Sequence, residues 1–88
     1  MKIENNAQAG TLESSDVYVT ILANPNDTID IQIKSIVYQQ FGQQIYQVAQ
    51  DTLLDLGITS CILLLEDKGA LDFTIKARIE SAVQRSIC

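Results

Sequence analysis

Residues 58–65 read Ile-Thr-Ser-Cys-Ile-Leu-Leu-Leu, a nearly continuous apolar run with the length of one β-strand. Such a run is typical of a strand that is covered on both faces or that lies in the middle of a sheet. A glycine precedes the run, and the polar stretch Glu66-Asp67-Lys68-Gly69 follows it. The run therefore predicts a bounded core strand, and the segments on either side of it complete the fold.

Helical patterns flank this strand in the sequence. Before it, apolar residues recur at helical spacing between Ser35 and Gly57, opposite a face rich in glutamine. Ser35 is the expected N-cap of this helix and Gly57 its expected stop. After the strand, residues 71–86 alternate in part like a strand, but their helical pattern runs longer. Alanines and long charged side chains also favour a helix there.

Two more strands are predicted upstream, because β-branched residues alternate over residues 16–23 and again over residues 28–34. Between them, Asn24-Pro25-Asn26-Asp27 is a cluster of turn-forming residues. We therefore expect these two strands to form an antiparallel hairpin. Residues 1–15 are expected to be a flexible N-terminal arm.

These elements follow one another in the order β-β-α-β-α. The expected fold class is α+β, a two-layer sandwich with a three-stranded sheet and two helices on one of its faces. Residues 16–88 form a single domain in this interpretation. The sequence leaves the order of the strands in the sheet open.

Composition limits the classes of function. The chain has 88 residues, of which 47% are hydrophobic and 19% charged, as in a globular protein. Its net charge of −5 disfavours binding to nucleic acid or to anionic lipid. We expect no signal peptide and no membrane span. Cys61 is expected to be a buried thiol and Cys88 an unpaired terminal one, which favours the reducing cytoplasm.

The residues that usually carry catalysis are missing or scattered. The chain contains no histidine, which excludes Ser–His–Asp and Cys–His pairs and a Cys/His zinc site. Its four glycines do not form a phosphate-binding loop. Glu66 and Asp67 are interpreted as a hydrated loop, and Lys76, Arg78 and Arg85 as ordinary surface charge. We expect neither catalytic residues nor a metal site.

Ser14 and Ser15 are the remaining feature. They lie side by side between Glu13 and Asp16, directly before the first predicted strand. One interpretation is structural, because serine and aspartate often bond the nearby backbone at the start of an element. The other is that an exposed serine without an activating base is an attachment point for a group that another enzyme transfers.

Three stretches resemble the acyl carrier (γ) subunit of citrate lyase, in order and spacing over nearly the whole chain. They are Ala-Gly-Thr-Leu-Glu-Ser-Ser-Asp-Val at 9–17, Asp-Lys-Gly-Ala-Leu-Asp at 67–72 and Ala-Arg-Ile-Glu at 77–80. The carrier subunit of malonate decarboxylase is a related alternative, and an unmodified acidic scaffold module is another. The Gly-Thr-Leu-Glu-Ser stretch favours the citrate lyase family.

The resemblance implies a covalent cofactor, 2′-(5″-phosphoribosyl)-3′-dephospho-coenzyme A, joined to serine through a phosphodiester. The matching residue is Ser14, with Ser15 as the second choice. In the family, an α subunit exchanges acetyl for citryl on the group's thiol, and a β subunit cleaves the citryl thioester to oxaloacetate. The implied partners are these subunits and the transferase that attaches the group. The chain itself is expected to carry the thioester without catalysing either step.

Overall fold

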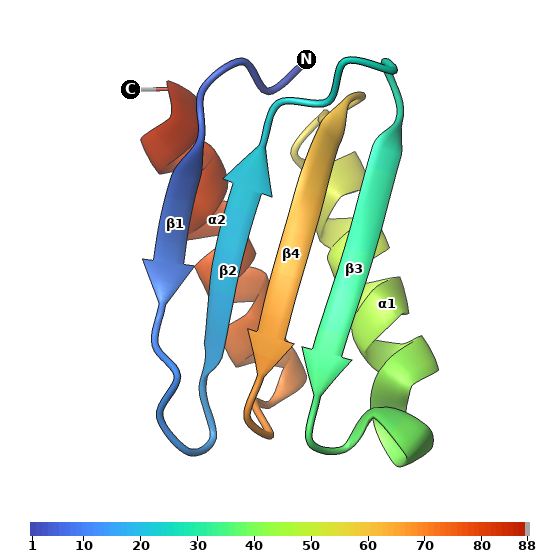
Figure 1. Ribbon diagram of the computed structural model, residues 1–88, viewed down its shortest axis with the longest axis vertical. Coiled ribbons are helices and arrows are strands. Elements are labelled where there is room, and N and C mark those ends of the chain that lie inside the picture. The colour runs from blue at the N-terminus through green and yellow to red at the C-terminus, as the bar shows by residue number, and fades with distance from the viewer. Residues whose placement is uncertain (88) are drawn as a thin grey trace.

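The computed structural model describes residues 1–87; Cys88, for which the sequence predicts an unpaired thiol, lies outside them. The element order is β1 (Ala7–Gly10), β2 (Val17–Leu22), β3 (Ile29–Ser35), α1 (Tyr38–Asp55), β4 (Cys61–Asp67) and α2 (Asp72–Ile87). The strands form one sheet, and both helices lie against the same face of it (Figure 1). The fold is therefore α+β and two-layered.

β4, which comes from the apolar run, lies inside the sheet, whose strand order is β1-β2-β4-β3. It pairs antiparallel with β2 and parallel with β3, so both of its edges are hydrogen-bonded. Cys61, Leu63 and Leu65 point into the core, whereas Ile62 and Leu64 on the other face are only half-buried. Of the two alternatives, the central strand is the one observed.

The predicted hairpin is wrong, because β4 separates β2 from β3. The turn-forming residues 24–27 do reverse the chain, but the connection that they form passes over the start of β4 to reach β3. Asn24 donates from its side-chain amide to the carbonyl oxygens of Thr28 (2.9 Å) and Cys61 (3.4 Å). Local turn chemistry specifies a reversal of the chain and does not specify which strand becomes the neighbour.

The predicted three-stranded sheet is also wrong, because the segment expected to be an arm supplies a fourth strand. β1 pairs antiparallel with β2 from Ala7 opposite Ile21 to Gly10 opposite Tyr18. Ala9 and Ile3 are buried, and the Ile3 amide donates to the Ser60 carbonyl oxygen at 2.9 Å. Four small or polar residues carry little strand signal of their own, and pairing with β2 is what makes them a strand.

The core lies between the sheet and the helices. α1 packs over β3, and α2 packs over β1 and β2. The fully buried residues include Val17, Val19, Ile21, Ala49, Leu53, Leu63, Ile75 and Ile79. α1 ends near Gly57, whose φ of +73° suits the residue after a helix, as predicted. Its start differs from the prediction: Ser35 remains in β3, and Val37 occupies the N-cap position without a side-chain cap.

Candidate attachment site

The two adjacent serines lie in the loop that joins β1 to β2, residues 11–16. Gly10 leads into this loop with a φ of +93°. A Cβ atom on Gly10 would lie 1.9 Å from the Val17 carbonyl oxygen, so only glycine fits there. The loop closes as a β-turn in which the Asp16 amide donates to the Glu13 carbonyl oxygen at 3.2 Å, with Ser14 and Ser15 as its central residues.

Asp16 organises the loop. Its carboxylate accepts hydrogen bonds from the Thr11 hydroxyl (2.7 Å), from the Val17 amide (2.7 Å) and from two nitrogens of Arg78. The Arg78 contacts are 3.1 Å from Nε and 2.8 Å from an Nη, the paired geometry in which arginine binds carboxylates most strongly. Arg78 foremost, and then Thr11, lower the pKa of Asp16 to about 2.

Arg78 is a site residue that the sequence does not reveal. It was expected to be ordinary surface charge, yet it fixes the attachment loop from α2, 62 positions along the chain from Asp16. No local spacing links two residues that far apart. The available signal is that both residues belong to the stretches that carry the family resemblance.

The two serines differ in backbone geometry although both are exposed. Ser15 has a φ of 64°, in the left-handed region, and its amide donates to the Lys68 carbonyl oxygen at 2.8 Å. The Lys68 amide in turn donates to the Asp16 carbonyl oxygen at 2.9 Å. Within residues 1–87, the side-chain hydrogen bonds of this loop involve Thr11 and Asp16, and neither serine hydroxyl takes part in one. Both hydroxyls therefore remain available for modification.

The connection from β4 to α2, residues 68–71, is hydrogen-bonded to the serine loop and is itself well ordered. Asp67 is buried, and its carboxylate accepts from the Ser35 hydroxyl (2.7 Å) and from the amides of Gly69 (3.2 Å) and Ala70 (2.9 Å). The adjacent Glu66 is half-buried in β4, so this pair is not the hydrated loop that the sequence predicts. These bonds hold residues 68–70 in place. Lys68 in turn restrains Ser15, because its carbonyl oxygen accepts a hydrogen bond from the Ser15 amide.

Other chemistry is limited in the described part of the chain. Cys61 is buried, and burial raises the pKa of its thiol to about 11, so it stays protonated at neutral pH. Residues 1–87 hold no group of three or more His, Cys, Asp or Glu side chains placed to bind a metal ion.

Neither helix within residues 1–87 combines the length and the hydropathy that a transmembrane helix requires.

Comparison with known proteins gives consistent results. A family model described as "Malonate decarboxylase delta subunit (MdcD)" matches residues 4–86. A relative from Albidiferax ferrireducens named citrate lyase acyl carrier protein is 51% identical, over 99% of this chain and 89% of the relative. A relative of the same name from Clostridium perfringens is 48% identical, over 98% of this chain and 85% of the relative. The relative from Haemophilus influenzae strain PittEE is 49% identical over 98% of this chain and 88% of its own length.

A solved structure has the same fold. It is a chain of a Pseudomonas malonate decarboxylase hetero-tetramer in complex with malonate, similar with a TM-score of 0.75 over 97% of this chain and 87% of that chain. Its sequence identity is 17%, so the likeness concerns the fold. The near-50% identity along almost the full chain is what identifies the protein: it belongs to the acyl carrier protein family that includes the citrate lyase acyl carrier proteins.

Proposed function

We propose that this chain is the acyl carrier subunit of citrate lyase and that Ser14 carries 2′-(5″-phosphoribosyl)-3′-dephospho-coenzyme A through a phosphodiester. The observation that carries the proposal is the state of the Ser14 hydroxyl. It is exposed and free of hydrogen bonds within residues 1–87, on a loop that is fixed by the hydrogen bonds of Asp16 and of the Ser15 amide. The Ser15 hydroxyl is equally exposed, and Ser15 is the second choice because Ser14 is the residue that matches the modified serine of the resembling family.

The charges around Ser14 suit an anionic group. Of the two acidic neighbours, Asp16 is already paired with Arg78, which leaves Glu13 as the flanking carboxylate without an ion pair among the described residues. Lys68 is half-buried and lies beside the loop through its backbone hydrogen bonds to Ser15 and Asp16. A phosphodiester at Ser14 therefore meets less repulsion than the Glu-Ser-Ser-Asp sequence alone implies.

The chain's own residues position the group and leave the chemistry to others. When bound, the group supplies a thiol that carries the acyl thioester. The hydrogen bonds of Asp16 and Lys68 hold the attachment point still, so the reach between active sites comes from the group itself. Tethering keeps the carried acyl group at a high effective concentration near each site. We assign no catalytic residue to this chain.

The partners in this proposal are the α subunit, which exchanges acetyl for citryl, and the β subunit, which releases oxaloacetate. A prosthetic-group transferase, the holo-citrate lyase synthase, modifies Ser14 beforehand. We place this assembly in the cytoplasm. In this proposal, residues 1–15 carry the attachment serine, and through β1 they share one sheet with residues 16–88.

A carrier for malonate decarboxylase is the second candidate. The description of the matching family model and the similar solved structure both concern that enzyme. Reconstitution separates the two: the citrate lyase carrier restores citrate cleavage with its α and β subunits. Restoration of malonate decarboxylation alone would assign the chain to the second candidate.

Intact mass of the protein from its native host tests the modification. We expect a mass increase equal to the phosphoribosyl-dephospho-coenzyme A group, and its loss in Ser14→Ala but not in Ser15→Ala. Labelling that persists in Ser14→Ala and disappears in Ser15→Ala would move the site by one residue. A native protein of unmodified mass in cells with an active transferase would make the chain an unmodified scaffold.

A further inference from the structure

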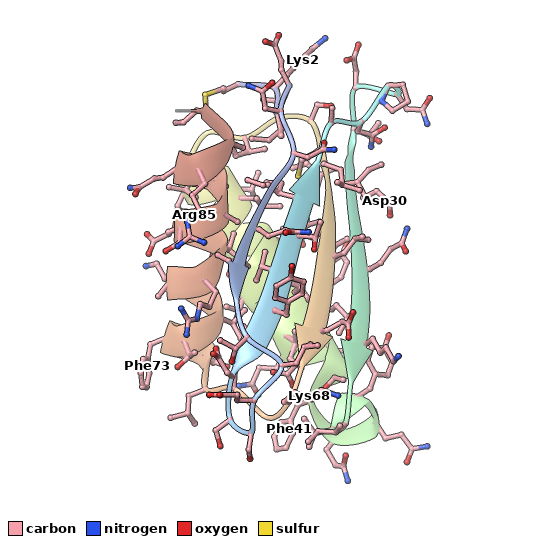
Figure 2. The ribbon with its side chains drawn as sticks, turned by 60° about the vertical axis from the view of Figure 1, so that its left-hand side comes forward. Lys2, Asp30, Phe41, Lys68, Phe73 and Arg85 are labelled. Atoms are coloured by element: carbon pink, nitrogen blue, oxygen red, sulfur yellow. The ribbon has the colours of Figure 1, made fainter. Side chains whose placement is uncertain are left out.

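An apolar groove opens at the same end of the molecule as the attachment loop. It lies between the first turns of α1 and α2 and has a volume of about 460 Å³, within the usual range for small-molecule sites. Its apolar lining consists of Val37, Phe41, Ile45, Ala70, Leu71 and Phe73. Figure 2 shows Phe41, Phe73 and Lys68 at this end of the fold, Phe73 on the outer side of α2.

The groove presents large apolar side chains to water. Phe73, in the first turn of α2, is 70% exposed, and Leu71, directly before α2, is 62% exposed. Burying such side chains is worth about 1.5–3 kcal/mol each, so a ligand that covers them gains part of that free energy. At the rim, the Gln44 amide nitrogen donates to both carboxylate oxygens of Asp72 at 3.0 Å. This arrangement leaves the Gln44 carbonyl oxygen as a hydrogen-bond acceptor beside an apolar floor.

The groove and the attachment loop are neighbours through the β4–α2 connection. Ser15 is hydrogen-bonded to Lys68, and the next residue, Gly69, already lines the groove. The stretch from Lys68 to Leu71 spans at most about 11 Å when fully extended. An arm made of a nucleotide and a pantetheine chain is longer than that and can fold back to it.

We infer that this groove binds the neutral pantetheine end of the arm carried on Ser14, so that the chain shelters its own thiol between reactions. The inference rests on the proposed carrier function. Pantetheine is a thin chain of methyl and methylene groups interrupted by amides, which fits an apolar groove with one amide acceptor at its rim. The anionic part of the arm stays at the attachment loop, away from the Asp72 carboxylate.

Tethering makes weak binding sufficient. A short flexible link supplies an effective concentration of about 1 mM, so a segment that binds the groove with a dissociation constant of about 0.3 mM is sheltered most of the time. The exposed fraction of the thiol then falls about four-fold.

The test measures alkylation of the arm thiol by iodoacetamide in the holo-protein, with loading first verified by intact mass and its position at Ser14 by peptide mapping. Peptide mapping separates the arm from Cys88, and Cys61 is a protonated, buried thiol that does not compete. We expect the arm thiol to react about four-fold more slowly than in Phe73→Ser and Phe41→Ser. Backbone amides of Gly69 to Phe73 should shift between apo- and holo-protein in nuclear magnetic resonance spectra.

Leu54→Ser is the matched control, because Leu54 is 59% exposed near the other end of α1 and outside the groove. It should keep the slow rate of the unsubstituted protein. Equal alkylation rates in all four loaded proteins, or groove amides that respond only to added partner subunits or to a second copy of the chain, would overturn the inference. A protein that an active transferase leaves unmodified would refute the carrier proposal itself, and the mass measurement reports that outcome separately.

Discussion

The two ends of the sheet use polar groups in different ways. At the attachment end, where β1, β3 and β4 finish, the carboxylates of Asp16 and Asp67 each accept at least three hydrogen bonds. At the opposite end, the ion pair of Lys2 with Asp27 is exposed, and the Met1 amino group donates to the Gly57 carbonyl oxygen. The end that presents Ser14 thus fixes its loops through two carboxylates, which suits the modification site proposed above.

A glycine at each end offers the strongest contrast. Gly10 and Gly57 both have positive φ, but a Cβ on Gly10 would meet the Val17 carbonyl oxygen at 1.9 Å, whereas one on Gly57 meets nothing within 4 Å. Gly57→Ala should therefore cost only the conformational penalty, about 1–2 kcal/mol. Gly10→Ala must also displace β1 from β2 and should cost at least about 3 kcal/mol of unfolding free energy. Urea unfolding of both variants measures the difference, and equal losses would contradict the comparison.

Buried polar groups give the second contrast. Asp67→Ala leaves the Ser35 hydroxyl and two loop amides without their acceptor, and we expect a loss of about 2–3 kcal/mol. Ser60, equally buried at the other end, makes one side-chain bond, to the Asn24 carbonyl oxygen at 3.3 Å, so Ser60→Ala should cost about 1 kcal/mol. Hydrogen exchange should show faster opening of residues 68–70 in Asp67→Ala. A greater loss from Ser60→Ala would reverse the ranking of the two ends.

Sequence patterns predicted the regular part of the fold and missed what assembles the site. Alternation and helical periodicity identified three strands and both helices, because burial of one face imposes those periods. They did not identify β1, because its four residues have weak strand preference and depend on pairing with β2 for their conformation. They also did not identify the neighbours of β4, because strand pairing is decided by the whole sheet.

The attachment site shows the same division. Ser14 and Ser15 were singled out from their position before a strand, and their exposure agrees with that reading. The sequence did not reveal the contacts that hold this loop. Arg78 binds Asp16 from 62 positions away, and Lys68 contacts Ser15 through backbone atoms. Backbone contacts carry no side-chain signature, so only the folded chain reveals them.

The ion pairs give the smallest contrast, and one that depends on pH. In the pair at the attachment end, the Arg78 side chain is 38% exposed and that of Asp16 13%, whereas Lys2 and Asp27 are 58% and 65% exposed. A lowering of the Asp16 pKa from 3.8 to about 2 corresponds to roughly 2 kcal/mol, which solvent screening of Arg78 reduces to about 1–2 kcal/mol. Lys2→Met should cost less than about 0.5 kcal/mol.

Because the folded-state pKa of Asp16 is depressed, its stabilisation is fully present above about pH 4 and is lost as the pH falls toward about 2. Urea unfolding of Arg78→Met should thus show a deficit of about 1–2 kcal/mol at pH 7 that narrows between pH 4 and pH 2. The deficit of Lys2→Met should stay small throughout this range. A constant deficit in Arg78→Met would mean that Arg78 stabilises the loop through packing of its aliphatic stem near Gly10, where its Cδ lies, and not through its charge.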